Sequence, residues 1–135
     1  MKYIDTNIFV SAVAGIAQNS AQAILNKIAL GELHAGTSLI TWDEFVWSLR
    51  KHLNPDQIHN ESKKFLLFPH LMFFDLNAEI VGRAHLITEK YNIQPRDALH
   101  AATALCNGAT EIISDDSDFD KIKELKRIHL KDALK

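Results

Sequence analysis

Short apolar runs alternate along the chain with segments whose apolar residues recur every three or four positions. The runs at residues 3–4, 71–74 and 112–113 predict buried strands, because a few consecutive apolar residues bounded by turn-forming residues are typical of a strand inside a sheet. Two further brief strands are expected at residues 33–35 and 128–130. The expected strands are therefore short and widely separated in sequence.

The segments between these runs carry helical periodicity. The clearest helix starts near residue 41 and has its apolar positions at helical spacing, namely Trp42, Phe45, Val46, Leu49 and Leu53. Further helices are expected at residues 8–14, at 21–30, from Pro55 to about 67, from the N-cap Asn77 to 91, and from Pro95 to the stop signal at Asn107 and Gly108. The last of these helices has a stripe of small residues that permits close packing.

Strands that alternate with helices are typical of an α/β domain. Such a domain has a central, mainly parallel sheet that is covered by helices on both faces. The sequence contains no internal repeat, linker or low-complexity segment. We therefore expect one domain over residues 1–135.

The composition narrows the class of protein further. The chain has 135 residues, 47% of them hydrophobic, which is enough for one domain with a substantial core. The net charge is −2, so no overall positive charge points to nucleic acid. The single cysteine, Cys106, excludes an internal disulfide and fits a reducing compartment. Because no apolar run approaches the roughly 20 residues of a membrane span and no signal peptide precedes the first strand, we expect a cytoplasmic protein.

Acidic residues directly follow two of the expected strands. Asp5 comes after the first strand, and the acidic run at 115–120 comes after the strand at 112–113. Ligands of open parallel sheets bind at the carboxyl ends of the strands, so both strands bring carboxylates to one edge. Asp97 lies in the first turn of its helix, at the end where a connection from that edge arrives. Each residue also has an ordinary explanation, Asp5 as a helix N-cap and Asp97 as a partner of the helix dipole.

The acidic run is harder to explain as a plain surface turn. Residues 111–120 hold five acids and no basic residue. Two carboxylates about 4 Å apart repel by roughly 4 kcal/mol at an effective dielectric of about 20, so gathering several costs stability unless a cation binds or some protonate. Oxygen ligands suit Mg²⁺ or Mn²⁺, and the seven histidines show no zinc-ligand spacing. The run therefore indicates a site for Mg²⁺ or Mn²⁺.

Two other polar residues give weaker signals. Glu44 lies opposite the apolar stripe of its helix, so spacing alone predicts an exposed glutamate. His100, three residues after Asp97, can share a helix face with it and orient it, although such a histidine is more often on the surface. Periodicity alone therefore assigns neither residue a functional role.

Four stretches, taken in order, resemble the motifs of one known family. They are Tyr-Ile-Asp-Thr-Asn at 3–7, Thr-Trp-Asp-Glu-Phe at 41–45, Pro-Arg-Asp-Ala-Leu-His-Ala-Ala-Thr-Ala at 95–104 and Ile-Ser-Asp-Asp-Ser-Asp-Phe at 113–119. The first two are unspecific alone, the last two are specific, and together the four span almost the whole chain. The sequence resembles the PIN-domain family, in particular the VapC-type toxin ribonucleases of prokaryotic toxin–antitoxin pairs.

The resemblance implies a fold, an activity and a set of site residues. The fold is a PIN-like three-layer α/β/α domain, and the activity is metal-dependent hydrolysis of single-stranded RNA by an endoribonuclease toxin. The family's catalytic acids correspond to Asp5, Glu44, Asp97 and Asp116. Its Mg²⁺ or Mn²⁺ ligands correspond to Asp5, Asp97, Asp116 and Asp118, and its supporting polar residues to Thr6, Asn7 and Ser114.

This resemblance changes two of the interpretations above. It gives Glu44 and Asp97 places in the acidic quartet, in spite of their ordinary explanations. The chain departs from the family at Asp115, where other members often have a basic or neutral residue. Either Asp115 or Asp116 is therefore the inward acid, and the register of the last motif favours Asp116.

The resemblance also implies partners. Carboxylates cannot attract RNA phosphates, so basic residues must do so, and Arg96, Lys121 and Lys123 are candidates. Residues 121–135 hold six basic and two acidic residues, which gives a local charge of +4 that serves either as a phosphate guide or as a solvated helix. We further expect a small antitoxin and a homodimer, the latter from the surplus of apolar residues in the helices at 21–30 and 42–53.

Other functions compete with this interpretation. A haloacid-dehalogenase-like phosphatase needs a second aspartate two residues after the first, and position 7 is Asn7, so that class is disfavoured. A PIN-type nuclease in RNA processing and a non-catalytic PIN-like binding module remain open alternatives. A metal-binding titration separates the binding module from a nuclease.

Overall fold

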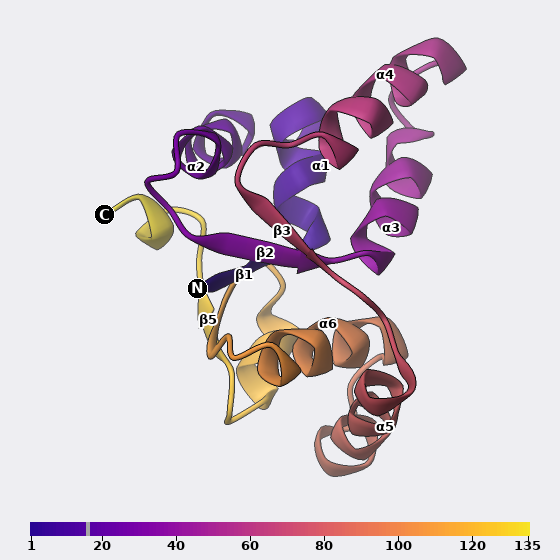
Figure 1. Cartoon of the computed structure of the whole chain (residues 1–135), viewed down its shortest axis with the longest axis vertical. Coiled ribbons are helices and arrows are strands. Elements are labelled where there is room, and N and C mark those ends of the chain that lie inside the picture. The colour runs from indigo at the N-terminus through magenta and orange to yellow at the C-terminus, as the bar shows by residue number, and fades with distance from the viewer. Residues whose placement is uncertain (16) are drawn as a thin grey trace.

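The computed structural model describes residues 1–15 and 17–135, and its centre is a β-sheet (Figure 1). The strands in this part of the chain are β1 (Lys2–Ile4), β2 (Ala35–Ser38), β3 (Leu71–Phe74), β4 (Glu111–Ile113) and β5 (Lys126–Ile128). They form one sheet in the order β3-β2-β1-β4-β5, and every neighbouring pair is parallel. In the central strand β1, Tyr3 lies opposite Gly36 on one side and Ile112 on the other. All strands therefore end at the same edge of the sheet.

Helices cover both faces of this sheet (Figure 1). One face carries α1 (Thr6–Ala14), α2 (Gln18–Ala29), α3 (Ile40–Leu49) and α4 (Pro55–Leu66), and the other carries α5 (Ala78–Tyr91) and α6 (Pro95–Cys106). Two short 3-10 helices, η1 (Ser117–Lys121) and η2 (Asp132–Leu134), follow β4 and β5. The predicted three-layer α/β/α fold with a parallel sheet is confirmed. Within the described residues no single helix is long and apolar enough to cross a membrane, and α1 with α2 reach that length and composition only as a pair bent by 118°.

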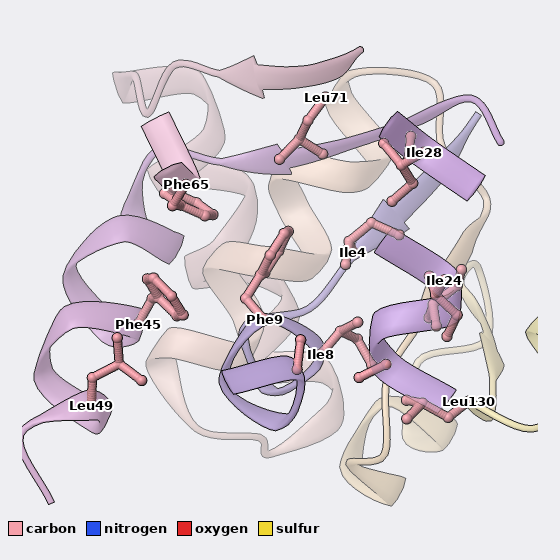
Figure 2. Close-up of a cluster of buried hydrophobic side chains, with 14 of the residues drawn as sticks. Ile4, Ile8, Phe9, Ile24, Ile28, Phe45, Leu49, Phe65, Leu71 and Leu130 are labelled. Carbon is pink, nitrogen blue, oxygen red and sulfur yellow. The ribbon is translucent and has the colours of Figure 1, made fainter. Parts of the chain in front are cut away.

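Side-chain alternation in β1 sends two neighbouring residues into different cores. Ile4 packs with Ile8 and Phe9 in the core beneath α1 to α4 (Figure 2). Tyr3 packs on the opposite face, with residues of α5 and α6. Both side chains are 0% exposed. Because both cores anchor this short strand, the residue that follows it, Asp5, has a firmly defined place.

Alanines allow α6 to approach the sheet and α5 closely. Ala98, Ala101, Ala102 and Ala104 are completely buried in the core on that side. Short side chains bring the backbone of a helix near its neighbours, as the stripe of small residues predicts. This close approach brings His100 of the same helix into contact with Tyr3 of β1.

Capping residues define where the helices begin. Asp5 accepts a hydrogen bond from the Thr6 N–H at the start of α1, and Asn77 caps α5 as predicted. Asn54 forms a capping box with Gln57 at the start of α4, where Pro55 occupies the first turn. These local signals explain why the starts of α4 and α5 could be predicted closely. The predictions for α1 and α2 were less accurate: α1 begins at Thr6 rather than at 8, and α2, which has no side-chain cap, begins at Gln18 rather than at 21.

The second strand lies further along the chain than predicted. The strand expected at 33–35 is wrong except at its last residue, because β2 runs from Ala35 to Ser38 through small and polar residues that are all buried. Gly36 leaves room for the Phe74 ring, since a Cβ atom at this position would lie 2.5 Å from the ring and would force it to move. The Thr37 hydroxyl donates to the Ile4 carbonyl oxygen at 2.8 Å. The polar groups of β2 are thus satisfied inside the protein, so an apolar pattern could not reveal this strand.

The last strand and the end of α3 also differ from the prediction. β5 runs from Lys126 to Ile128 rather than over 128–130, because an edge strand tolerates exposed basic residues. Leu130 lies beyond the strand and is buried in the core. The helix α3 ends at Leu49, and Leu53 packs against the core from the connection to α4.

Candidate active site

Four acidic side chains from separate parts of the chain line one pocket at the edge where the strands end. Asp5 follows β1, Asp116 follows β4, Glu44 lies on α3, and Asp97 lies in the first turn of α6. The pocket has a volume of about 290 Å³ and is lined by Asp5, Thr6, Asn7, Val10, Glu44, Trp47, Ser48, Arg96, Asp97 and Asp116. The structure thus brings together all four acids that the resemblance selected.

Asp5 is fixed by hydrogen bonds to both of its carboxylate oxygens. Its Oδ1 accepts from the Thr6 N–H at 2.8 Å. Its Oδ2 accepts from the Ser114 hydroxyl at 2.6 Å and from Asn7 Nδ2 at 3.1 Å. Burial raises the pKa of Asp5 above its ordinary value, although His100 and these hydrogen bonds oppose that rise. The three predicted supporting residues therefore surround Asp5.

Ser114 links Asp5 to the acidic run after β4. Its hydroxyl oxygen accepts from the Asp116 backbone N–H at 2.9 Å while the hydroxyl donates to Asp5. Asp116 in turn caps η1, because its Oδ1 accepts from the Asp118 N–H at 2.9 Å. The loop is therefore folded back on itself, so that Asp116 and Asp118 are held near the end of β1.

Three carboxylates come close enough to share a cation. One oxygen from each of Asp97, Asp116 and Asp118 lies within 4.8 Å of the others. Burial raises the pKa of Asp97 to about 6, and the negative charges of Asp116 and Asp5 add to this rise. The charge of His100 opposes this rise without cancelling it, so the protein itself compensates the ionised form of Asp97 only in part.

The chemistry of this cluster fits a hard divalent cation. All its donors are carboxylate oxygens, which Mg²⁺ and Mn²⁺ prefer. Asn7, which lines the same pocket, has a buried Oδ1 for which the described residues provide no hydrogen-bond donor. Such an oxygen is available to a bound water or ion. The residues present therefore suit the metal that the resemblance implies.

The proposed metal ligands do not all lie in this cluster. Asp97, Asp116 and Asp118 belong to it, whereas Asp5 lies beside it with both oxygens engaged by the protein. Asp115 lies elsewhere: its Oδ1 is 3.3 Å from His129 Nε2, and it lines a different cavity. Of the two adjacent acids, the structure places Asp116 in the acidic pocket.

Glu44 is held from inside the protein and is not the exposed residue that spacing alone predicts. Its Oε1 accepts hydrogen bonds from His100 Nε2 and, at 3.1 Å, from the Thr6 hydroxyl. Its side chain is 18% exposed. Burial acts to raise the pKa of Glu44, but the hydrogen bond and charge of His100 outweigh it and hold the pKa below the ordinary value.

His100 and Tyr3 were not selected as site residues from the sequence. His100 does not orient Asp97, as its spacing allowed, but contacts Glu44 and the Tyr3 hydroxyl. Burial acts to lower the pKa of His100, but Tyr3 and Glu44 raise it well above its ordinary value. The available signals were a tyrosine in a short central strand and a histidine in an alanine-rich buried helix, since both polar groups need partners there.

Of the three candidate basic residues, Arg96 is the one that lines the pocket. Its Nη2 is 3.7 Å from Asp43 Oδ2. Lys121 Nζ is 3.5 Å from Asp118 Oδ1, and Lys123 is exposed just after η1. The segment after η1 forms β5 and a short 3-10 helix rather than a charged α-helix.

The raised pKa of Asp97 predicts how the stability of the metal-free protein depends on pH. Between pH about 4 and 6 the folded protein binds this proton more tightly than the unfolded chain, so the free energy of unfolding should fall as pH rises. We expect Asp97 to account for about 1–2 kcal/mol of this fall, allowing for solvent screening. Urea denaturation at several pH values checks it, and Asp97→Asn should flatten the curve. A slope equal in both proteins would contradict the crowding of charge around Asp97.

Solved structures with a similar fold include toxin–antitoxin proteins. A VapBC complex from Rickettsia felis bound to a promoter DNA fragment has a TM-score of 0.74 and 23% identity, and the alignment covers 96% of this chain and 98% of that chain. A toxin–antitoxin complex from Klebsiella pneumoniae has a TM-score of 0.69 and 23% identity, with 93% and 95% covered. A sarcin–ricin loop-cleaving VapC toxin from Mycobacterium tuberculosis has a TM-score of 0.75 and 12% identity, with 91% and 95% covered. These likenesses show a shared fold.

A family model agrees with the fold and with the arrangement of the acids. No match was found among curated proteins. The model described as the PIN domain matches residues 2–125, which include all four acids of the pocket. From this match over nearly the whole chain, and from the fold and the acids at the sheet edge, it follows that the chain belongs to the PIN-domain family.

Proposed function

We propose that this protein is a metal-dependent endoribonuclease that hydrolyses single-stranded RNA. The observation that carries the proposal is the meeting of Asp5, Glu44, Asp97 and Asp116 in one pocket of a PIN-domain protein. Three oxygen ligands within 4.8 Å of one another suit the cation that phosphodiester hydrolysis by carboxylates requires. A sarcin–ricin loop-cleaving toxin among the similar folds supports RNA as the substrate.

The acidic residues in and beside the pocket would have different roles in hydrolysis. Asp97, Asp116 and Asp118 would hold Mg²⁺ or Mn²⁺, with Asp5 beside them as a further carboxylate. Such a cation supplies a more acidic water and neutralises charge on the scissile phosphate. Glu44, whose pKa is held low, is ionised at neutral pH and accepts a hydrogen bond from the attacking water, which it orients.

The supporting residues keep this arrangement rigid. Ser114 and Asn7 hold Asp5, and Thr6 joins Asp5 to Glu44 through its backbone N–H and its hydroxyl. Arg96 at the pocket, together with Lys121 and Lys123 near η1, would attract the RNA backbone that the carboxylates repel. Positive charge on Arg96 and on the segment after the acidic run, and negative charge in the pocket, would thus serve different parts of one substrate.

We further propose a biological setting, the toxin of a toxin–antitoxin module that acts in the cytoplasm as a single domain over residues 1–135. The similar folds of toxin–antitoxin complexes support a small antitoxin as partner. We also propose a homodimer. The apolar residues of α2 and α3 mostly fill the core, as Ile24 and Phe45 do, but Leu30, which follows α2 as its C-cap, and Trp47 of α3 are 70% and 60% exposed and offer apolar contact area. The alternative setting is RNA processing.

Removing divalent cations should abolish RNA cleavage by the purified protein. We expect EDTA to reduce the cleavage of a single-stranded RNA at least about 100-fold, because the carboxylates alone cannot activate water or neutralise the phosphate. Excess Mg²⁺ or Mn²⁺ should restore the activity. Gel analysis of an end-labelled RNA measures it. Equal cleavage with and without EDTA would refute the metal mechanism, and no cleavage with either metal would refute the nuclease.

A further inference from the structure

A buried, hydrogen-bonded series of side chains ends on Glu44. We propose that His100, itself held by Tyr3, is a positioning residue that fixes the orientation of Glu44 toward the pocket. The inference rests on the proposed function, because it concerns how Glu44 is oriented for hydrolysis. Neither His100 nor Tyr3 is among the described residues that line the pocket, so both act through Glu44.

The series begins in the middle of the sheet. The Ser38 backbone N–H donates to the Tyr3 hydroxyl oxygen at 3.1 Å, and this hydroxyl lies 2.6 Å from His100 Nδ1. The Tyr3 and His100 rings meet edge-to-face with their centroids 5.7 Å apart. Tyr3 is 0% exposed and His100 is 1% exposed. Because these groups come from β2, β1 and α6, the position of the imidazole is defined by the whole fold.

The direction of hydrogen bonding follows from the chemistry of the partners. An ionised carboxylate only accepts, so His100 Nε2 must carry a proton toward Glu44 Oε1. In a neutral imidazole Nδ1 then accepts from the Tyr3 hydroxyl, and in an imidazolium Nδ1 donates to the Tyr3 oxygen. Nε2 donates to Glu44 in both forms, so the positioning role holds in either charge state.

Glu44 is held through only one of its two oxygens. Oε1 accepts from both His100 and Thr6. No protein donor to Oε2 occurs among the described residues, and the Glu44 side chain lines the pocket. A glutamate on a helix surface otherwise samples several rotamers. By selecting one of them, His100 keeps Oε2 available to the pocket.

Packing alone is a poorer account of this histidine. Its neighbours on the buried face of α6 include Ala101 and Ala102, which are completely buried. Burying an imidazole costs free energy unless its nitrogens have partners, and an apolar side chain would fill the same space without that cost. Both nitrogens do have partners, and one of these partners is a carboxylate of the proposed active site.

Two substitutions of His100 separate packing from positioning. In His100→Asn the shorter side chain can reach Tyr3 but not Glu44, whereas in His100→Gln the amide can occupy the place of Nε2 and donate to Glu44. We expect His100→Asn to lower kcat for RNA cleavage by about 10- to 100-fold with little change in KM. His100→Gln should recover most of that loss. The matched control is His85→Asn, which breaks an exposed histidine–glutamate pair on α5 and should leave kcat unchanged.

NMR of the metal-free protein gives a readout that does not depend on activity. Imidazole ¹H–¹⁵N spectra should contain a slowly exchanging Nε2 proton that His100→Asn removes. Glu44→Gln and Tyr3→Phe should both shift this signal, because each changes one partner of the ring. His85→Asn should leave it in place. Melting temperatures show which variants are folded, and Tyr3→Phe provides the kcat test if His100→Asn does not fold.

The outcomes separate this inference from the proposed function. A folded His100→Asn variant with the kcat of wild type would overturn the positioning role, as would a loss that His100→Gln shares in full. A wild-type protein without metal-dependent cleavage would overturn the proposed function instead. In that case the imidazole signal still tests whether His100 contacts Glu44. A signal that Glu44→Gln does not shift would show that this contact is absent.

Discussion

Replacing Asp97 with asparagine should reduce metal-dependent RNA cleavage at least about 100-fold while the protein stays folded. The amide keeps the shape of the side chain and removes only the charge. In the structure this charge lies in the cluster with Asp116 and Asp118, and its pKa is raised to about 6 by burial and by its acidic neighbours. Losing the charge therefore removes a proposed metal ligand and, in the metal-free protein, relieves repulsion. Cleavage rates at saturating Mg²⁺ or Mn²⁺ measure the effect.

The matched control for this experiment is Asp56→Asn. Asp56 occupies the first turn of α4, as Asp97 occupies the first turn of α6, but it is exposed and lies outside the acidic pocket. If Asp97 only complemented the helix dipole, both substitutions would have the same small effect on stability and neither would affect cleavage. Near wild-type cleavage by Asp97→Asn would therefore show that the assignment is wrong.

Adding Mg²⁺ at about ten times its dissociation constant should stabilise the wild-type protein by about 1.4 kcal/mol. For a domain of this size that corresponds to a rise of about 4–6 °C in melting temperature. Asp116→Asn should do two opposite things: raise the melting temperature without metal and reduce the further gain from Mg²⁺. The first follows because Asp116 raises the pKa of Asp97, and the second because Asp116 belongs to the cluster.

Two features of the structure make the comparison of Asp116→Asn with wild type easy to interpret. Asparagine retains the Oδ1 atom with which Asp116 caps η1, so the loop should keep its shape. The adjacent Asp115 pairs with His129 outside the pocket, so Asp115→Asn should leave the gain from Mg²⁺ as large as in wild type. If Asp116→Asn responded fully to Mg²⁺ and Asp115→Asn did not, the two acids would have to exchange roles.

Local signals made most of the fold predictable from the sequence. The apolar run of β3 and the caps at Asn54 and Asn77 place their elements within a residue or two of where they lie. The position of β2 was predicted wrongly because its residues suit contacts with distant parts of the chain. Gly36 leaves room for the Phe74 ring, and the Thr37 hydroxyl donates to a carbonyl oxygen of β1. A pattern that records hydrophobicity along one segment contains neither constraint.

The site was predictable to a different degree. The rule that ligands bind where parallel strands end led to Asp5 and to the acidic run, which both lie there in the structure. Glu44 came only from the family resemblance, because its position opposite the apolar stripe is typical of an exposed residue. The contact between His100 and Glu44 joins positions 56 apart on two helices, so no spacing within either helix could reveal it.

The central place of the first strand also bears on how the protein is made. β1 is synthesised before the other four strands, yet it pairs with β2 and β4, and Asp5 accepts a hydrogen bond from Ser114, 109 positions later. The hydrogen bond between the Tyr3 hydroxyl and His100 likewise needs a residue that is synthesised 97 positions later. In a partly synthesised chain Asp5, Glu44 and Asp97 therefore lack the loop after β4, which contributes Asp116 and holds Asp5 through Ser114. The pocket therefore cannot form before the acidic run at 115–120 has left the ribosome, so the proposed nuclease would gain its complete set of acids only late in the translation of this domain.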